Sequence, residues 1–141
     1  MLRTLQAVLA LHVVGFALWV GGLVAACRLL RVGRREADAG ARARLAGAAR
    51  KVALVPDLGA TLAIACGAWM LVKLEAWREP WMHIKLTLVA VTVGLHGLCR
   101  VKARRAARGE GGLPAFVLPL LAVVAAGIVA LAVFKAPSRG G

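Results

Sequence analysis

Residues that suit covalent cofactors, soft metals or acidic chemistry are scarce in this chain. Its three cysteines, Cys27, Cys66 and Cys99, show neither CxxC nor CxxCH spacing, which leaves a covalently attached haem and a zinc cluster without support. Only three methionines are present, so soft ligands for copper are few. Aspartate and glutamate together number 6 against 19 lysines and arginines, and the net charge is therefore +13.

A strongly basic chain can bind nucleic acid, because clustered lysines and arginines neutralise phosphates. Here, however, the basic residues lie between apolar runs that are long enough to cross a bilayer. The hydrophobic share of 61% and the mean hydropathy of +0.80 also exceed what soluble domains show. We therefore expect membrane lipid, and no nucleic acid, as the partner of this surface.

The apolar runs predict the fold class. Each approaches the roughly 20 residues that a helix needs to cross about 30 Å of hydrocarbon. They cover residues 5–27, 52–72, 81–98 and 113–134. Because lipid offers no partner to unpaired backbone groups, we expect an all-α, integral membrane four-helix bundle that forms a single transmembrane domain over residues 1–141.

The charges between the runs predict the orientation. Most basic residues fall in the first connection, 28–51, and in the third, 99–112, and the positive-inside rule places both connections in the cytoplasm. Both chain termini then face outward. The segment 37–49 is rich in alanine and arginine, so we expect it to continue as a helical arm on the cytoplasmic side.

Ionisable residues inside the predicted spans are the first candidates for function, because burying them in lipid is costly. The sequence has five such residues: His12, Asp57, His83, Lys85 and His96. They include all three histidines of the chain. Imidazole binds metals and transfers protons, so this distribution favours ligation or proton transfer over ordinary packing.

On the first predicted helix, His12, Gly15 and Trp19 recur at spacings of three and four and share one stripe with Gly22 and Ala26. A flat macrocycle could lie over Gly15 with its iron at His12. Alternatively, the small residues allow close helix contact and Trp19 serves as an anchor.

On the third predicted helix, Lys85 and His96 share a face and His83 points elsewhere. Helical rise places His12 at the depth of His83 and Lys85, whereas His96 lies closer to the cytoplasm. Lys85 could also simply snorkel to the outer interface. For Asp57 the pattern favours capping of its helix, with a pairing to a loop arginine as the alternative.

The segment "PWMHIKLTLVAVTVGLHGLC" at 80–99 resembles the W-x-H-x-K-L-x-L-V motif, ending in a histidine, of the HemJ-type protoporphyrinogen IX oxidases. These are small four-helix haem-biosynthesis proteins of the bacterial inner membrane. The first helix is similar to theirs through "ALHVVGFALWVGGL", and the second retains a proline and Gly67. The ending "AVFKAP" resembles the lysine-proline terminus of the family.

The resemblance implies a haem b cofactor and the removal of six electrons and protons from protoporphyrinogen IX. Electrons would pass to a respiratory-chain acceptor, for which a quinone is a candidate. It makes His12 the leading haem ligand, with Gly15, Trp19 and Lys85 beside the cofactor. His83, Lys85 and His96 become candidates for the second ligand, for substrate carboxylate binding or for proton removal, with His83 the candidate metal ligand.

Two parts of the sequence depart from the family pattern. The chain has no tyrosine, and "AACRLLRVG" at 25–33 replaces a pattern of proline, aromatic and Tyr-His residues. "GEGGLP" at 109–114 replaces an Asn-Glu-x-Pro segment. Two alternatives therefore stay open: a non-enzymatic haem b protein for electron transfer or haem handling, and a copper-handling membrane protein of the CopD type. The sequence leaves open whether the chain forms a homo-oligomer.

Overall fold

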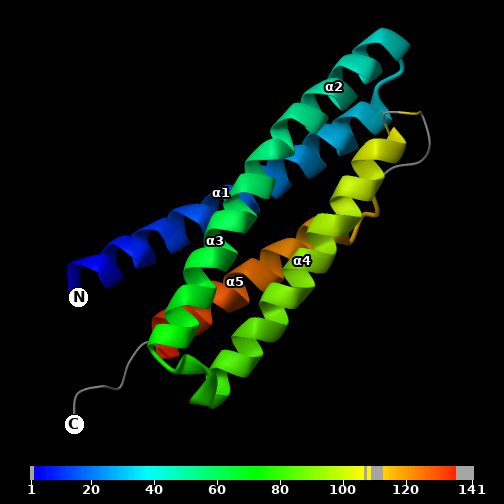
Figure 1. The fold of residues 1–141 in the computed structure, drawn as a ribbon. Helices are drawn as coiled ribbons and strands as arrows, with labels where there is room; N and C mark the ends of the chain where they lie inside the picture. The colour runs from blue at the N-terminus through cyan, green and yellow to red at the C-terminus, as the bar shows by residue number, and fades with distance from the viewer. Residues whose placement is uncertain (1, 107, 109–112, 136–141) are drawn as a thin grey trace.

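The structure is a computed structural model that describes residues 2–106, 108 and 113–135, the last without its side chain. The described residues are helical and include no strand (Figure 1). The elements are α1 (Leu2–Arg35), α2 (Ala39–Val52), α3 (Leu54–Lys73), the short 3-10 helix η1 (Ala76–Arg78), α4 (Pro80–Ala106) and α5 (Val117–Lys135). Most of the segment "GEGGLP" and the end of the lysine-proline terminus lie outside the described residues.

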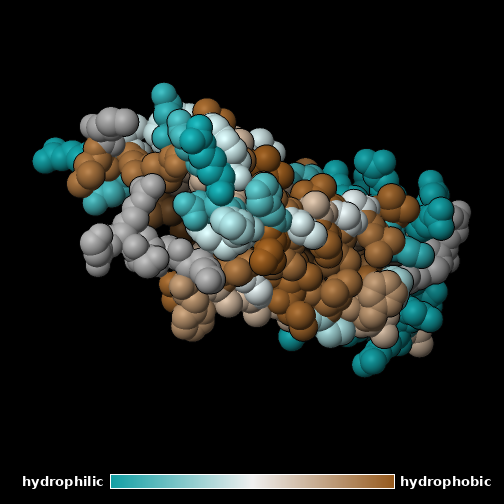
Figure 2. All heavy atoms as spheres, turned by 90° about the horizontal axis from the view of Figure 1, so that it is seen from below, coloured by the Kyte–Doolittle hydropathy of each residue, from teal (hydrophilic) through white to brown (hydrophobic). Residues whose placement is uncertain are grey.

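Four helical segments are long and apolar enough to cross a membrane. They are Leu2–Arg35, Ala39–Lys73, Pro80–Ala106 and Val117–Phe134. Figure 2 shows an apolar band across the middle of the molecule, with hydrophilic side chains gathered toward both ends. The prediction of an all-α, multi-pass membrane protein is confirmed at this level, and the orientation stays a prediction.

The helices extend beyond the predicted apolar runs at their basic ends. α1 continues to Arg35 and α4 to Ala106, because alanine, leucine and arginine favour helix well after the hydrophobic run has ended. The alanine- and arginine-rich segment forms α2, as expected. Asp38 caps α2, since its carboxylate accepts a hydrogen bond from the backbone N–H of Ala41.

The helical path from α2 into α3 is interrupted at Ala53. Pro56 follows three residues later and lacks the N–H that would bond to the carbonyl of Val52 in a continuous helix. The chain therefore starts a new helix at Leu54, two residues after the predicted start at 52. Pro56 is buried in the first turn of α3, where the missing donor costs little.

α1 packs most extensively against α3, and α4 packs against α5. The two pairs meet through contacts of α1 with α4 and α5. The main buried cluster consists of Trp19, Leu23, Cys27, Ala60, Ala63, Leu95, Cys99, Leu113, Val117 and Leu121. In Figure 1 the basic ends of α1 and α4 and the start of α2 lie together at one end of the molecule, opposite the amino terminus.

Candidate functional site

The small residues of the α1 stripe form a tight contact with α3. A Cβ added at Gly15 would lie 2.7 Å from the backbone nitrogen of Ala63, and one added at Gly22 would lie 2.5 Å from the ring of Pro56. From the other side, a Cβ at Gly59 would lie 2.4 Å from the backbone nitrogen of Trp19. The space beside Gly15 is thus filled by α3, which leaves no room there for the macrocycle slot and matches the close-contact alternative.

His12 is held against α3 on this same interface. Its Nδ1 lies 2.7 Å from the carbonyl oxygen of Ala63. Its ring occupies the place where Gly67 has no side chain, since a Cβ there would lie 2.9 Å from Cε1 of His12. Gly67 was noted from the sequence as a glycine in the second apolar run. Its role in making room for His12 depends on how α1 and α3 pack together.

The partner of His12 fixes its tautomer. A carbonyl oxygen can only accept, so Nδ1 carries the proton and Nε2 keeps its lone pair. This is the arrangement in which metal-binding histidines are usually held. Lys85 is half-buried on α4, which contacts α1, and its pairing with His12 stays a prediction.

His96 belongs to a separate polar network, closer to the basic end. The indole Nε1 of Trp19 donates to Nδ1 of His96 at 3.0 Å, and Nε2 of His96 lies 2.8 Å from Oδ1 of Asp57. Because the indole N–H can only donate, Nδ1 of His96 carries no proton. Its Nε2 is therefore protonated and donates a hydrogen bond to Asp57. Both ring nitrogens are therefore occupied, and neither is free for iron in this arrangement.

Asp57 differs from its favoured sequence interpretation. The N-cap of α3 is Ala53, with no side-chain capping bond, and the second carboxylate oxygen of Asp57 instead lies 3.0 Å from Arg100. The alternative of an arginine partner is the one observed, although Arg100 lies within α4 rather than in a loop. The backbones of α3 and α4 stay apart, so these side chains bridge a gap between the two helices.

The remaining candidates are less enclosed. His83 is exposed on α4, two residues before Lys85.

Trp19 is only 2% exposed, so it is a core residue that donates a hydrogen bond to His96 and is not an exposed anchor. The sequence singled out Asp57 as a candidate but did not identify Arg100 as its partner. An acid inside an apolar span, which needs a partner, was the available signal.

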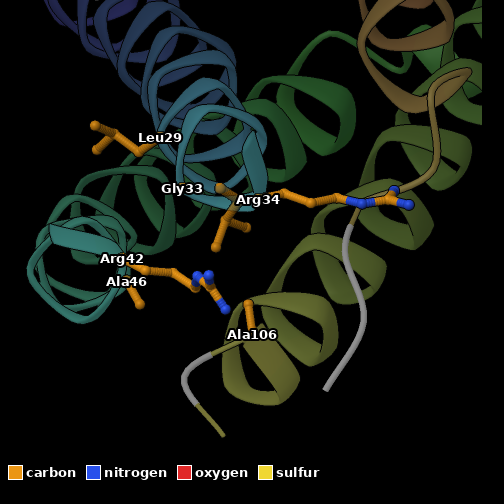
Figure 3. Close-up of a pocket in the computed structure, with 7 residues that line it drawn as sticks. Leu29, Gly33, Arg34, Arg42, Ala46 and Ala106 are labelled. Atoms are coloured by element: carbon orange, nitrogen blue, oxygen red, sulfur yellow. The ribbon is translucent and has the colours of Figure 1, made fainter. Parts of the chain in front are cut away.

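Two hollows flank α1, and neither contains a histidine. An apolar groove of about 690 Å³ lies between α1 and α5, bordered on α1 by Val13, Phe16 and Val20. Its centre is about 100° around α1 from His12, given 3.6 residues per turn. A smaller pocket of about 230 Å³ lies at the basic end between α1, α2 and α4. Figure 3 shows Arg42 reaching from α2 across this pocket toward Ala106.

Of the two arginines that line the small pocket, Arg42 forms hydrogen bonds with the backbone. The guanidinium of Arg42 donates to the carbonyl oxygens of Glu36 and Ala37, where α1 turns into α2.

Within the described residues, no group of three histidine, cysteine or acidic side chains is arranged to hold a metal ion. Comparisons with known protein families, with characterised proteins and with solved structures found no match to this chain.

Proposed function

We propose that this chain binds haem b through His12 and oxidises protoporphyrinogen IX to protoporphyrin IX in the bacterial inner membrane. The resemblance of 80–99 and of the first helix to the HemJ-type oxidases supplies the reaction. The observation that supports haem binding is the hydrogen bond between Nδ1 of His12 and the carbonyl oxygen of Ala63. It leaves the lone pair of Nε2 available to iron, within an apolar span.

The described residues offer the one or two ligands that a haem needs, and not a group of three or more for a bare metal ion. A porphyrin supplies four ligands itself, so the protein needs to add only one or two. His12 can provide one, and His83 is the candidate for the second because His96 has both nitrogens engaged. When bound, haem b supplies an electron carrier within the membrane, from which a quinone could take the electrons.

The chain's own residues would bind the substrate and move protons. The ammonium of Lys85, half-buried near His12, could pair with a propionate carboxylate of the substrate. Protons released during oxidation need a path out of the apolar region. The His96–Asp57 pair is a candidate for that path, since Arg100 beside it is about a third exposed.

A second candidate function is a haem b protein without oxidase activity. It is favoured by the hydrogen bonds of His96, which accepts from Trp19 and donates to Asp57. Neither ring nitrogen of His96 is then free to take a proton from a substrate. The protein would then carry electrons or haem, with His12 in the same ligand role and His96 in a structural one.

The visible spectrum of the purified protein tests the cofactor. His12→Ala should abolish the Soret band while the protein still inserts into the membrane. His83→Ala is the matched variant on an exposed histidine, and an altered band there would identify the second ligand. Full haem retention by His12→Ala would remove the basis of the proposal.

The enzyme and the binding protein are separated by genetic rescue. The oxidase should restore haem synthesis in a bacterium that lacks its own protoporphyrinogen oxidase, whereas a carrier of electrons or haem should not. A protein that shows a normal Soret band and gives no rescue would therefore establish the second candidate.

A further inference from the structure

Two cysteines that are 72 residues apart in the sequence meet in the core. Sγ of Cys27 on α1 lies 2.9 Å from Sγ of Cys99 on α4. Cys27 is 0% exposed and Cys99 is 4% exposed. No cysteine motif predicts this pair, because the contact forms only through the packing of α1 on α4.

The distance favours covalent closure over metal binding. A disulfide has an S–S bond of about 2.0 Å, so the two sulfurs would need to approach by only about 0.9 Å. Two thiolates on one tetrahedral zinc, with bonds of about 2.3 Å, stand about 3.7 Å apart. Holding such an ion would force α1 and α4 apart, whereas a disulfide would draw them slightly together.

The surroundings restrict which oxidant can reach the pair. The sulfurs belong to the buried cluster that includes Trp19, Leu23 and Leu95. A charged, water-soluble disulfide such as oxidised glutathione would have to enter this apolar region at a high desolvation cost. A lipid-soluble two-electron acceptor can instead approach from the bilayer.

We propose that Cys27 and Cys99 are a redox-active dithiol that closes to a disulfide between α1 and α4, with a membrane quinone as the oxidant. Two S–H bonds break and one S–S bond forms. The two electrons and two protons reduce the quinone to its quinol. The inference does not rest on the proposed function, but the disulfide would fix the helix of His12 relative to the helix of Lys85.

Thiol counting on the reduced, detergent-purified protein tests the proposal. A tetrasubstituted short-chain benzoquinone, which cannot add to thiols at a ring carbon, should lower the free thiols from three to one per chain under anaerobic conditions. Mass spectrometry should find the peptides of Cys27 and Cys99 linked, and a phosphine reductant should restore all three thiols. Oxidised glutathione should have little effect over the same time.

Single variants locate the reaction. Cys66→Ser, which removes the remaining thiol on α3, should still form the Cys27–Cys99 link, whereas Cys27→Ser and Cys99→Ser should keep their two thiols free. The proposal is overturned if the wild-type thiol count does not fall, if a link requires Cys66, or if stoichiometric zinc protects the pair by binding it. Because the decisive count uses the wild-type chain, a poorly folded variant does not weaken the test.

Discussion

At the scale of single residues, the absence of a Cβ at Gly67 makes room for the imidazole ring of His12. Gly67→Ala would place a Cβ 2.9 Å from Cε1 of His12 and push the imidazole away from the Ala63 carbonyl. Because losing the group that orients a metal ligand typically weakens metal binding by roughly 10–100-fold, we expect a haem affinity reduced by about tenfold. Haem titration followed at the Soret band measures it.

Gly94→Ala is the control for this prediction. A Cβ at Gly94 would meet no atom within 4 Å, so the variant changes a helical glycine of the membrane region without touching His12. Equal haem affinity in the two variants would show that the position of the His12 ring does not govern binding.

Lys85 offers a second test at this scale, because it is a half-buried charged residue on a membrane-spanning helix. Lys85→Met keeps the length and removes the charge, so we expect a normal haem spectrum together with loss of genetic rescue. Lys73→Met, at an exposed lysine that ends α3, should change neither. Full rescue by Lys85→Met would leave Lys85 a snorkelling residue, and loss of both readouts would make it part of the haem site.

At the scale of helices, the α1–α3 contact depends on glycines that let the backbones approach. Gly59→Ala would place a Cβ 2.4 Å from the backbone nitrogen of Trp19, which cannot move without shifting α1. Overpacking of this kind costs about 1–3 kcal/mol. We expect a corresponding fall in the free energy of unfolding, measured by denaturation in detergent.

Gly21→Ala is the matched substitution on the facing helix. Gly21 lies on α1 beside Gly22, and a Cβ there meets nothing within 4 Å. It should leave stability nearly unchanged. A similar loss in both variants would show that the close contact with α1 does not account for the cost of Gly59→Ala.

The bridge between α3 and α4 is a second test for helices. Asp57→Ala removes the acceptor for both His96 and Arg100, and bonds to a charged group contribute about 1.5–3 kcal/mol each when well shielded. Since Asp57 is about a third exposed, we expect a loss of about 1–2 kcal/mol in the free energy of unfolding.

Glu75→Gln breaks the Arg78–Glu75 pair, whose side chains are 71% and 58% exposed. That exposed pair should contribute at most about 1 kcal/mol. Comparing the two variants by thermal unfolding separates a partly buried bridge between helices from an exposed ion pair. If both cost the same, the Asp57 bridge does not hold α3 and α4 together.

At the scale of the whole molecule, the basic ends of α1 and α4 gather on one side, and the positive-inside rule predicts that this side is cytoplasmic. Cysteines introduced at Arg42 and Arg105 should resist an impermeant thiol reagent in intact cells, whereas one at Glu79 should react. Disrupted cells should label all three. The opposite pattern in intact cells would invert the topology and the side on which the site opens.

The sequence-based predictions succeeded where a pattern is local. An apolar run of membrane length must form a helix in lipid whatever its neighbours are, so four spans could be assigned from hydropathy alone. The alanine- and arginine-rich arm followed from helix propensity in the same way. The helix ends were less accurate, because α1 and α4 continue as helices after the apolar signal stops.

Hydropathy was enough to identify a helical membrane protein and to single out His12, Asp57 and His96 as costly residues that need partners. Their partners became known only once the helices were packed together. His12 meets the Ala63 carbonyl, and His96 joins Trp19 to Asp57. A residue's type and depth follow from its own helix, whereas its contacts depend on the rotation and pairing of helices distant in sequence, which no local pattern specifies.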